Sequence, residues 1–94
     1  MTEQTLEKEI TVVNKAGLHA RPASAIVMAV SASDSAVRIT NIETGAEADG
    51  ASTMSMLTLS APFGTRLRIT VTGKDAEQVL ASVVRLFETG FGED

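Results

Sequence analysis

The sequence predicts an α+β fold: an open-faced β-sandwich in which a four-stranded antiparallel sheet carries three helices on one face. Two observations lead to this prediction. Short segments with apolar residues at every second position alternate with longer segments whose apolar residues recur every three or four positions. A chain of 94 residues must also stack two layers of secondary structure to bury one core. The predicted order is β-α-β-β-α-β-α, and residues 1–94 are expected to form a single domain.

The first strand is predicted over residues 6–13, where apolar side chains occupy alternate positions. Lys8 stands where this alternation requires an apolar residue. After a loop at 14–17, the first helix is predicted from the place of Pro22, because a proline costs no hydrogen bond in the first turn of a helix. Four apolar residues at helical spacing form its core-facing stripe: Ala23, Ile26, Val27 and Val30.

Two strands and a short helix are predicted in the middle of the chain. Residues 37–40 alternate between apolar and polar side chains, and residues 46–51 form a weaker candidate strand. Ser52 is the predicted N-cap of a short helix, because a serine hydroxyl can accept a hydrogen bond from an N–H of the first turn. Met56 and Leu59 are the predicted core residues of this helix.

The last strand and helix have the clearest patterns. Residues 66–72 alternate strictly between polar and apolar side chains. Asp75 and Gln78 resemble a capping box at the start of the last helix, and Gly90 predicts its end. Its apolar stripe consists of Val79, Leu80, Val83, Leu86 and Phe87. The acidic tail beyond Gly90 is expected to be solvated.

Composition excludes several functional classes. The net charge of -4 argues against binding to a nucleic-acid backbone, and the three aromatic residues, all Phe, offer little for stacking bases. Without cysteine and with one histidine, the chain lacks the side chains for disulfides, thiolate chemistry or a multi-histidine metal site, so no metal and no cofactor is expected. No apolar run approaches the ~18 residues of a membrane span. The sequence therefore predicts a cytoplasmic protein without membrane insertion.

The residues that carry chemistry lie where a loop meets the first helix, in the run Gly17-Leu18-His19-Ala20-Arg21-Pro22. A helix start attracts anions through its free N–H groups and its dipole, and the same positive end disfavours a protonated imidazole. His19 is therefore expected to be neutral and nucleophilic. Arg21 can offer a planar fork of donors to a phosphate, and Gly17 can take the positive φ that bends the loop. Spacing alone leaves another interpretation open, since a lone histidine at a helix start is also typical of a capping or solvent-exposed residue.

The run from Gly17 to Ala23 resembles the active-site signature of the HPr family, the histidine-containing phosphocarriers of the bacterial sugar phosphotransferase system. A second stretch, residues 52–59 with Gly64 beyond it, resembles the family's regulatory-serine helix. The order of elements predicted above is also the family's order. The resemblance thus extends from about Leu6 to Phe87, and two separate motifs in the right order make it specific.

The resemblance implies a phosphoryl-group carrier rather than an enzyme with its own small-molecule substrate. His19 would accept a phosphoryl group on its Nδ1 nitrogen from an Enzyme I-type donor and pass it to an Enzyme IIA-type acceptor. Arg21 would assist, and Gly17 and Ala20 would belong to the phosphate cradle. Phosphoenolpyruvate would be the distal source. Such a transfer needs mainly positioning and charge stabilisation, which suits a small protein.

The resemblance also implies a regulatory position and a docking surface. Ser52 matches the serine that an HPr kinase/phosphorylase modifies in many relatives, although a capping role alone also explains a serine there. Met54 and Leu57, together with Met28 on the first helix, match positions that face partner proteins. Flexible, exposed methionines suit several partners, but filling of the core is the alternative for each of them. The protein is expected to be a monomer.

Two functional questions stay open in the sequence. Residues 14–17 and the tail at 86–94 resemble NPr, the nitrogen-related branch of the family, but the sequence does not decide whether sugar uptake or nitrogen-related regulation is served. A binding module of the same fold that regulates partners without phosphotransfer is the alternative function. The presence of His19 and Arg21 favours the carrier, because function resides in the site and not in the fold.

Overall fold

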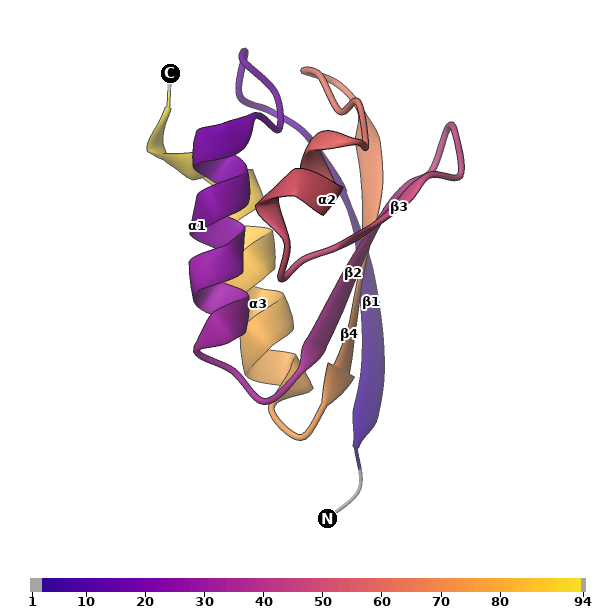
Figure 1. The fold of residues 1–94 in the computed structure, drawn as a ribbon, viewed down its shortest axis with the longest axis vertical. Helices are drawn as coiled ribbons and strands as arrows, with labels where there is room; N and C mark the ends of the chain where they lie inside the picture. Colours follow the sequence, from indigo (N-terminus) through magenta and orange to yellow (C-terminus); the bar gives the residue numbers. More distant parts are fainter. Residues whose placement is uncertain (1–2, 94) are drawn as a thin grey trace.

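The computed structural model describes residues 3–93 of the chain. Its helices and strands follow the predicted order, with a short 3-10 turn (η1) after the last helix. Their bounds are β1 (Gln4–Thr11), α1 (Ala20–Ser31), β2 (Ala36–Asn41), β3 (Glu47–Asp49), α2 (Thr53–Leu57), β4 (Arg66–Gly73), α3 (Ala76–Glu88) and η1 (Gly90–Gly92). The strands form one antiparallel sheet in the order β1-β4-β2-β3, and the three helices lie on one face of it (Figure 1). The predicted α+β fold is confirmed.

The register of the sheet explains why alternation was a reliable signal. In the central strand β4, Ile69 is paired with Ile39 of β2, and Val71 is paired with Leu6 of β1. Apolar residues of neighbouring strands therefore line up in rows on the helix-covered face, and Leu67, Ile69 and Val71 are fully buried. Residues on the other face of β4 are arginines and threonines.

The two long helices cover this face, with α3 packed against β1, β4 and α1. Of the stripe predicted for α1, Ala23, Ile26 and Val30 are buried, while Val27 is half-buried. In α3 the residues Val79, Val83 and Phe87 are buried as predicted. Val84 is buried as well, which the predicted stripe missed, because α3 contacts both an edge strand and its neighbour and so buries a wider face.

Lys8 occupies the position in β1 where the alternation breaks. It lies between Leu6 and Ile10 on the helix-covered side of the strand and is paired with the buried Ile69, yet it is itself exposed. It borders a shallow hollow whose other sides come from α3 and β1: Leu6, Glu77, Leu80, Ala81, Val84 and Glu88. Because β1 is an edge strand, a long side chain here can reach water past the margin of the sheet.

The capping box predicted at the start of α3 is wrong. Asp75 occupies the N-cap position but makes no side-chain bond to its own helix. Its carboxylate instead accepts hydrogen bonds from the Ser35 hydroxyl and the Asp34 backbone N–H, which lie in the connection between α1 and β2. The Ser35 hydrogen bond is the main cause that holds the pKa of Asp75 below its ordinary value. A contact distant in sequence has replaced the local one.

The weakly predicted third strand is present but shorter than expected, with Glu47–Asp49 in place of residues 46–51. Ladder pairing with β2 covers only these three residues. Beyond them the N–H of Gly50 still donates to Val37, and the N–H of Ala51 donates to the Asp49 carboxylate. The chain thus turns out of the sheet directly into α2.

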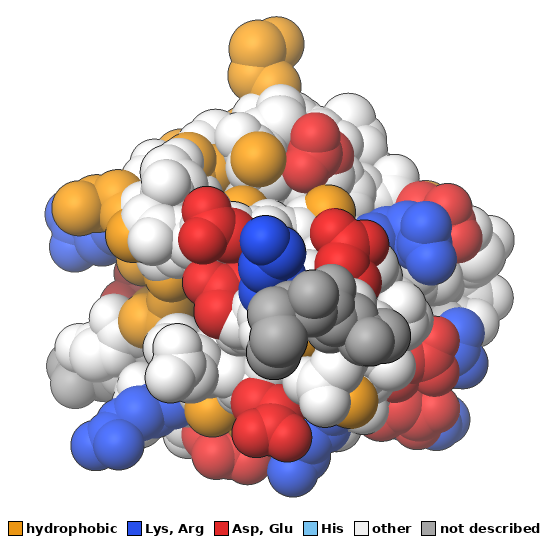
Figure 2. All heavy atoms as spheres, turned by 90° about the horizontal axis from the view of Figure 1, so that it is seen from below, with side chains coloured by type: hydrophobic (Ala, Val, Ile, Leu, Met, Phe, Trp, Pro, Cys, Tyr) orange, Lys and Arg blue, Asp and Glu red, His pale blue; other side chains and the backbone are white. Residues whose placement is uncertain are grey.

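The start of β1 lies at one end of the elongated molecule, and the loop that precedes α1 lies at the other (Figure 1). Figure 2 shows the N-terminal end, where acidic and basic side chains are interspersed and neither sign forms a continuous patch. Within residues 3–93, none of the helices is both long enough and apolar enough to cross a membrane.

Candidate functional site

The loop before α1 is fastened to the segment at 61–65. The Leu18 N–H donates to the Ala61 carbonyl at 2.9 Å, and Gly17 has a φ of +74°. A Cβ atom at Gly17 would lie 2.7 Å from the Ala61 oxygen and 2.8 Å from Pro62 Cα, which is too close for any side chain. The predicted positive φ of Gly17 is confirmed. Glycine is required here both by the backbone conformation and by the close approach of the two loops.

His19 is the N-cap residue of α1. Its backbone is extended, with φ −102° and ψ −168°, and its carbonyl accepts the N–H of Ala23 at 3.0 Å. Its side chain makes no capping bond, so the capping interpretation applies to the backbone alone. The imidazole is 42% exposed. In the described part of the chain, nothing accepts a hydrogen bond from the N–H groups of Ala20 and Arg21 in the first turn, so the helix start presents two free donors.

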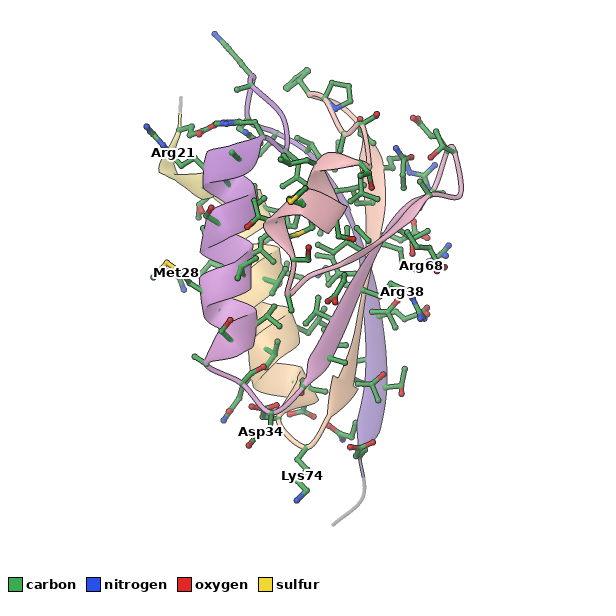
Figure 3. All side chains as sticks on the ribbon, viewed as in Figure 1. Arg21, Met28, Asp34, Arg38, Arg68 and Lys74 are labelled. Carbon is green, nitrogen blue, oxygen red and sulfur yellow. The ribbon has the colours of Figure 1, made fainter. Side chains whose placement is uncertain are left out.

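Arg21 and Met28 share the outward side of α1. Figure 3 shows Arg21 at the first turn and Met28 about two turns further on, both directed away from the sheet. Both residues are exposed. Gly17, His19, Ala20 and Arg21 are thus gathered at one helix start, whereas Met28 lies further along the same helix.

A residue that sequence reasoning missed lies directly against His19. The Glu93 Oε2 atom is 2.9 Å from His19 Nε2, and Glu93 Oε1 accepts a hydrogen bond from Asn14 Nδ2 at 3.0 Å. The carboxylate is 18% exposed. The Asn14 hydrogen bond is the main cause that holds the pKa of Glu93 below its ordinary value, and the nearby His19 and Arg21 act in the same direction. The expectation of a solvated acidic tail is therefore wrong for Glu93.

The tail contains a signal that could have predicted this contact. Gly90 follows the C-cap of α3 with a φ of +62°, as expected for a glycine that ends a helix. An apolar residue directly after such a glycine commonly packs back on the helix, and Phe91 does so: its ring lies edge-on to Phe87 with the ring centres 4.9 Å apart. A chain turned back in this way carries Glu93 to the loop before α1 rather than into solvent.

The predicted short helix is present as α2 and packs against α1. Ser52 is its N-cap, with its hydroxyl accepting the Ser55 N–H at 3.1 Å, so the capping prediction is confirmed. Met56 is fully buried and Leu59 nearly so. Met54 is 80% exposed and Leu57 is also exposed, so neither fills the core. These residues form a surface on an element separate from that of His19.

Two further exposed apolar residues were not predicted. Val13 and Phe63 lie in the two loops that pair next to Gly17, where the Val12 N–H donates to Thr65 and the Gly64 N–H donates to Val12. Both loops lie at the same end of the molecule as the start of α1 (Figure 1). The position of Phe63 between a proline and a glycine is the signal that marks it as an exposed turn residue. In the part of the chain that the structure describes, no three side chains able to hold a metal ion come together.

Comparison with known proteins agrees with this fold and identifies the family. The family described as "PTS HPr component phosphorylation site" matches residues 6–89. Phosphocarrier protein NPr of Escherichia coli K12 is 36% identical over 90 residues, which cover 96% of this chain and 99% of that protein. Phosphocarrier protein HPr of Xylella fastidiosa is 36% identical over 95% of this chain and 98% of its own length. The solved structure of HPr-C-His from Thermoanaerobacter tengcongensis superposes with a TM-score of 0.86 at 30% identity, covering 95% of this chain and 98% of that one.

The open-faced sandwich and these matches define a class of small phosphocarrier proteins. The chain belongs to the HPr family of the phosphotransferase system. The multiphosphoryl transfer protein of Salmonella typhimurium is 38% identical over 99% of this chain, but the match covers 25% of that longer protein. The chain therefore spans about a quarter of the length of the multiphosphoryl transfer proteins that it matches.

Proposed function

We propose that this protein is a phosphocarrier of a phosphoenolpyruvate-dependent phosphotransferase system, acting in the cytoplasm. It accepts a phosphoryl group on His19 from a phosphorylated Enzyme I-type donor and passes it to an Enzyme IIA-type domain. The position of His19 carries this proposal. Its ring is not used for capping, is nearly half exposed, and lies at a helix start with two free N–H groups.

The neighbouring residues have separate roles in this proposal. The Nδ1 atom of His19 forms the bond to phosphorus, and the N–H groups of Ala20 and Arg21 face the incoming charge. The Arg21 side chain is exposed and can donate two parallel hydrogen bonds to phosphoryl oxygens. Gly17 sets the bend of the loop that presents the ring. The protein has no other substrate in this scheme and acts only through its covalent phosphohistidine.

The exposed apolar residues supply the partner contact in this proposal. Met54 and Leu57 on α2, with Met28 on the outward side of α1, form a docking surface for the donor and the acceptor. Ser52, at the start of α2, is the position at which an HPr kinase/phosphorylase would act. The carrier works as a monomer, since each partner must reach the same exposed histidine.

A mass measurement tests the carrier function. Incubation with phosphoenolpyruvate and the cognate Enzyme I should add one phosphate that is labile in acid and stable in base. His19 is the chain's single histidine, so His19→Ala should remove this phosphate completely. Equal phosphorylation of the variant, or no phosphorylation of the wild type, would show that the proposed function is wrong.

The branch of the family is tested with the acceptors. The relatives named NPr and HPr are equally similar to this chain, at 36% identity each, so identity does not separate them. The phosphorylated carrier should be isolated and mixed separately with Enzyme IIA-type domains of the sugar and nitrogen branches from the same organism. We assign the protein to the branch whose acceptor takes the phosphate at least about tenfold faster. This ratio corresponds to a difference of about 1.4 kcal/mol in the barrier to transfer.

A further inference from the structure

Glu93 is held in place by a fastened tail. Beyond α3, residues 90–92 all have positive φ values, and the chain turns away from the helix toward the start of α1 (Figure 1). The ring of Phe91 packs on the fully buried Phe87, and the Glu93 N–H donates to the Gly90 carbonyl at 2.9 Å. The ring contact and this hydrogen bond together fix the backbone of Glu93. The backbone position therefore directs the Glu93 side chain toward His19.

The carboxylate has a fixed orientation as well. Asn14 is 1% exposed, and its Nδ2 atom donates both to the Gly17 carbonyl at 2.7 Å and to Glu93 Oε1. The reversed amide would turn its oxygen toward two acceptors, so only this orientation is favourable. It leaves the buried Asn14 Oδ1 without a partner among the described residues, which shows that the two Nδ2 bonds determine the orientation. Asn14 thus joins the bend of the His19 loop to the carboxylate.

The contact determines which ring nitrogen of His19 carries the proton. An ionised carboxylate can only accept hydrogen bonds, so the Nε2 atom 2.9 Å from Glu93 must be the protonated one. In a neutral imidazole the lone pair then lies on Nδ1. Among residues 3–93, no group forms a hydrogen bond with Nδ1. The free nitrogen is thus the nucleophilic one.

We propose that Glu93 is a positioning residue of His19, a role that rests on the proposed phosphocarrier function. It keeps the ring in the tautomer with Nδ1 unprotonated, and it stabilises the phosphorylated ring. In the transfer, the Nδ1 lone pair forms the N–P bond while the leaving atom of the donor takes the electron pair of the bond that breaks. The proton stays on Nε2, and the ring becomes cationic. The charge beside this cation is that of Glu93, with Arg21 at the same helix start available to the phosphoryl oxygens.

The test compares Glu93→Gln with Glu43→Gln. Both substitutions remove one negative charge, but Glu43 is an exposed residue after β2 whose side chain makes no hydrogen bond in the structure. The 15N chemical shifts of the imidazole report the tautomer directly, in the unphosphorylated protein. In wild type and Glu43→Gln they should show mainly the Nε2–H form. In Glu93→Gln they should show a mixture, because the amide can either accept from Nε2–H or donate to an unprotonated Nε2.

The phosphorylated protein gives the second readout. The acid lability of phosphohistidine means that the ring hydrolyses in its protonated form, so loss of the carboxylate that stabilises this cation should slow hydrolysis about three- to tenfold in Glu93→Gln. Glu93→Asp, which keeps the charge, should return the hydrolysis rate most of the way to that of wild type, and Glu43→Gln should match wild type. An unchanged tautomer ratio and lifetime in Glu93→Gln, with His19 normally phosphorylated, would overturn this inference and leave the carrier function intact. A wild-type protein that takes no phosphate would instead overturn the carrier function.

Discussion

The geometry of the Arg21 side chain can be tested apart from its charge. Arg21→Lys keeps the positive charge but loses the planar pair of donors, and Arg21→Ala loses both. We expect phosphoryl transfer to slow about tenfold in Arg21→Lys and about a hundredfold in Arg21→Ala. Because Arg21 is exposed, the melting temperature should change by no more than about 2 °C in either variant.

Arg38→Ala is the matched control for this prediction. Arg38 is also an exposed arginine, but it lies on β2, at the opposite side of the molecule from Arg21 (Figure 3). The Arg38→Ala variant should transfer the phosphoryl group at the wild-type rate. Wild-type rates in both Arg21 variants, measured by rapid quench with phosphorylated Enzyme I, would mean that Arg21 has no part in the transfer.

At the residue scale, the sequence pointed to the local part of the candidate site but missed its distant member, Glu93. His19, Arg21 and Gly17 stand in one short run, and the physics of a helix start applies to such a run without knowledge of the fold. Glu93 is separated from His19 by more than seventy residues, and their contact exists only because the sheet brings the first loop and the end of α3 to the same end of the molecule. Local patterns carry no information about such a pair.

At the scale of elements, α2 offers the sharpest test of docking. Replacing Met54 and Leu57 by Ala should leave the fold intact, because both side chains are exposed. We expect phosphorylation of His19 to slow about tenfold at low carrier concentration, since the apolar contact with Enzyme I is weakened. At saturating carrier the rate should recover, because the chemistry at His19 is untouched. A loss that persists at saturation would show that α2 is not a docking surface.

Ser52 gives the same surface an electrostatic test. Ser52→Asp should still cap α2, because aspartate is a good N-cap residue, but it places a charge beside exposed apolar side chains. We expect slower phosphorylation by Enzyme I at unchanged helix content measured by circular dichroism. Ser52→Ala is the control. It removes the cap at a cost of about 1 kcal/mol and adds no charge, so it should be less stable and yet react at nearly the wild-type rate.

The elements were predictable where one periodicity extended over many residues. The alternation in β4 and the apolar stripe in α3 each extend along the whole element. Each pattern places its apolar residues on one face, and burial of that face stabilises the conformation that the local sequence already favours. The failures lie at element ends. The carboxylate of Asp75 caps a neighbouring loop instead of its own helix, and β3 ends early because Gly50 and Ala51 turn the chain into α2. Both outcomes depend on segments that are distant in sequence.

At the scale of the whole molecule, the sheet has two edges, and Lys8 protects one of them. An inward-facing lysine on an edge strand opposes the addition of a second strand, because its charge would be buried. Lys8→Leu would give β1 an unbroken apolar face with Leu6 and Ile10. We expect this variant to self-associate as its concentration rises, with the average mass followed by sedimentation. Phosphorylation of His19, at the end of the molecule beyond β1, should not change in the monomer.

Lys74→Leu is the control for this association. It removes the same charge from the exposed turn between β4 and α3, away from the free strand edge (Figure 3). It should remain as monomeric as the wild type. Association of Lys74→Leu to the same degree would assign the effect to net charge, and a monomeric Lys8→Leu protein would show that the edge is blocked by something other than Lys8.

The first strand begins and the last turn ends at opposite ends of the molecule, which bears on how the protein can be labelled. The molecule is about 40 Å long, with the start of β1 at one end and η1 toward the other (Figure 1). An affinity tag or fluorophore attached ahead of Glu3 would lie far from the imidazole. The same group attached behind Glu93 would crowd the ring and strain the glycine turn beneath it. Activity assays and immobilisation on a sensor surface should therefore use the amino-terminal side.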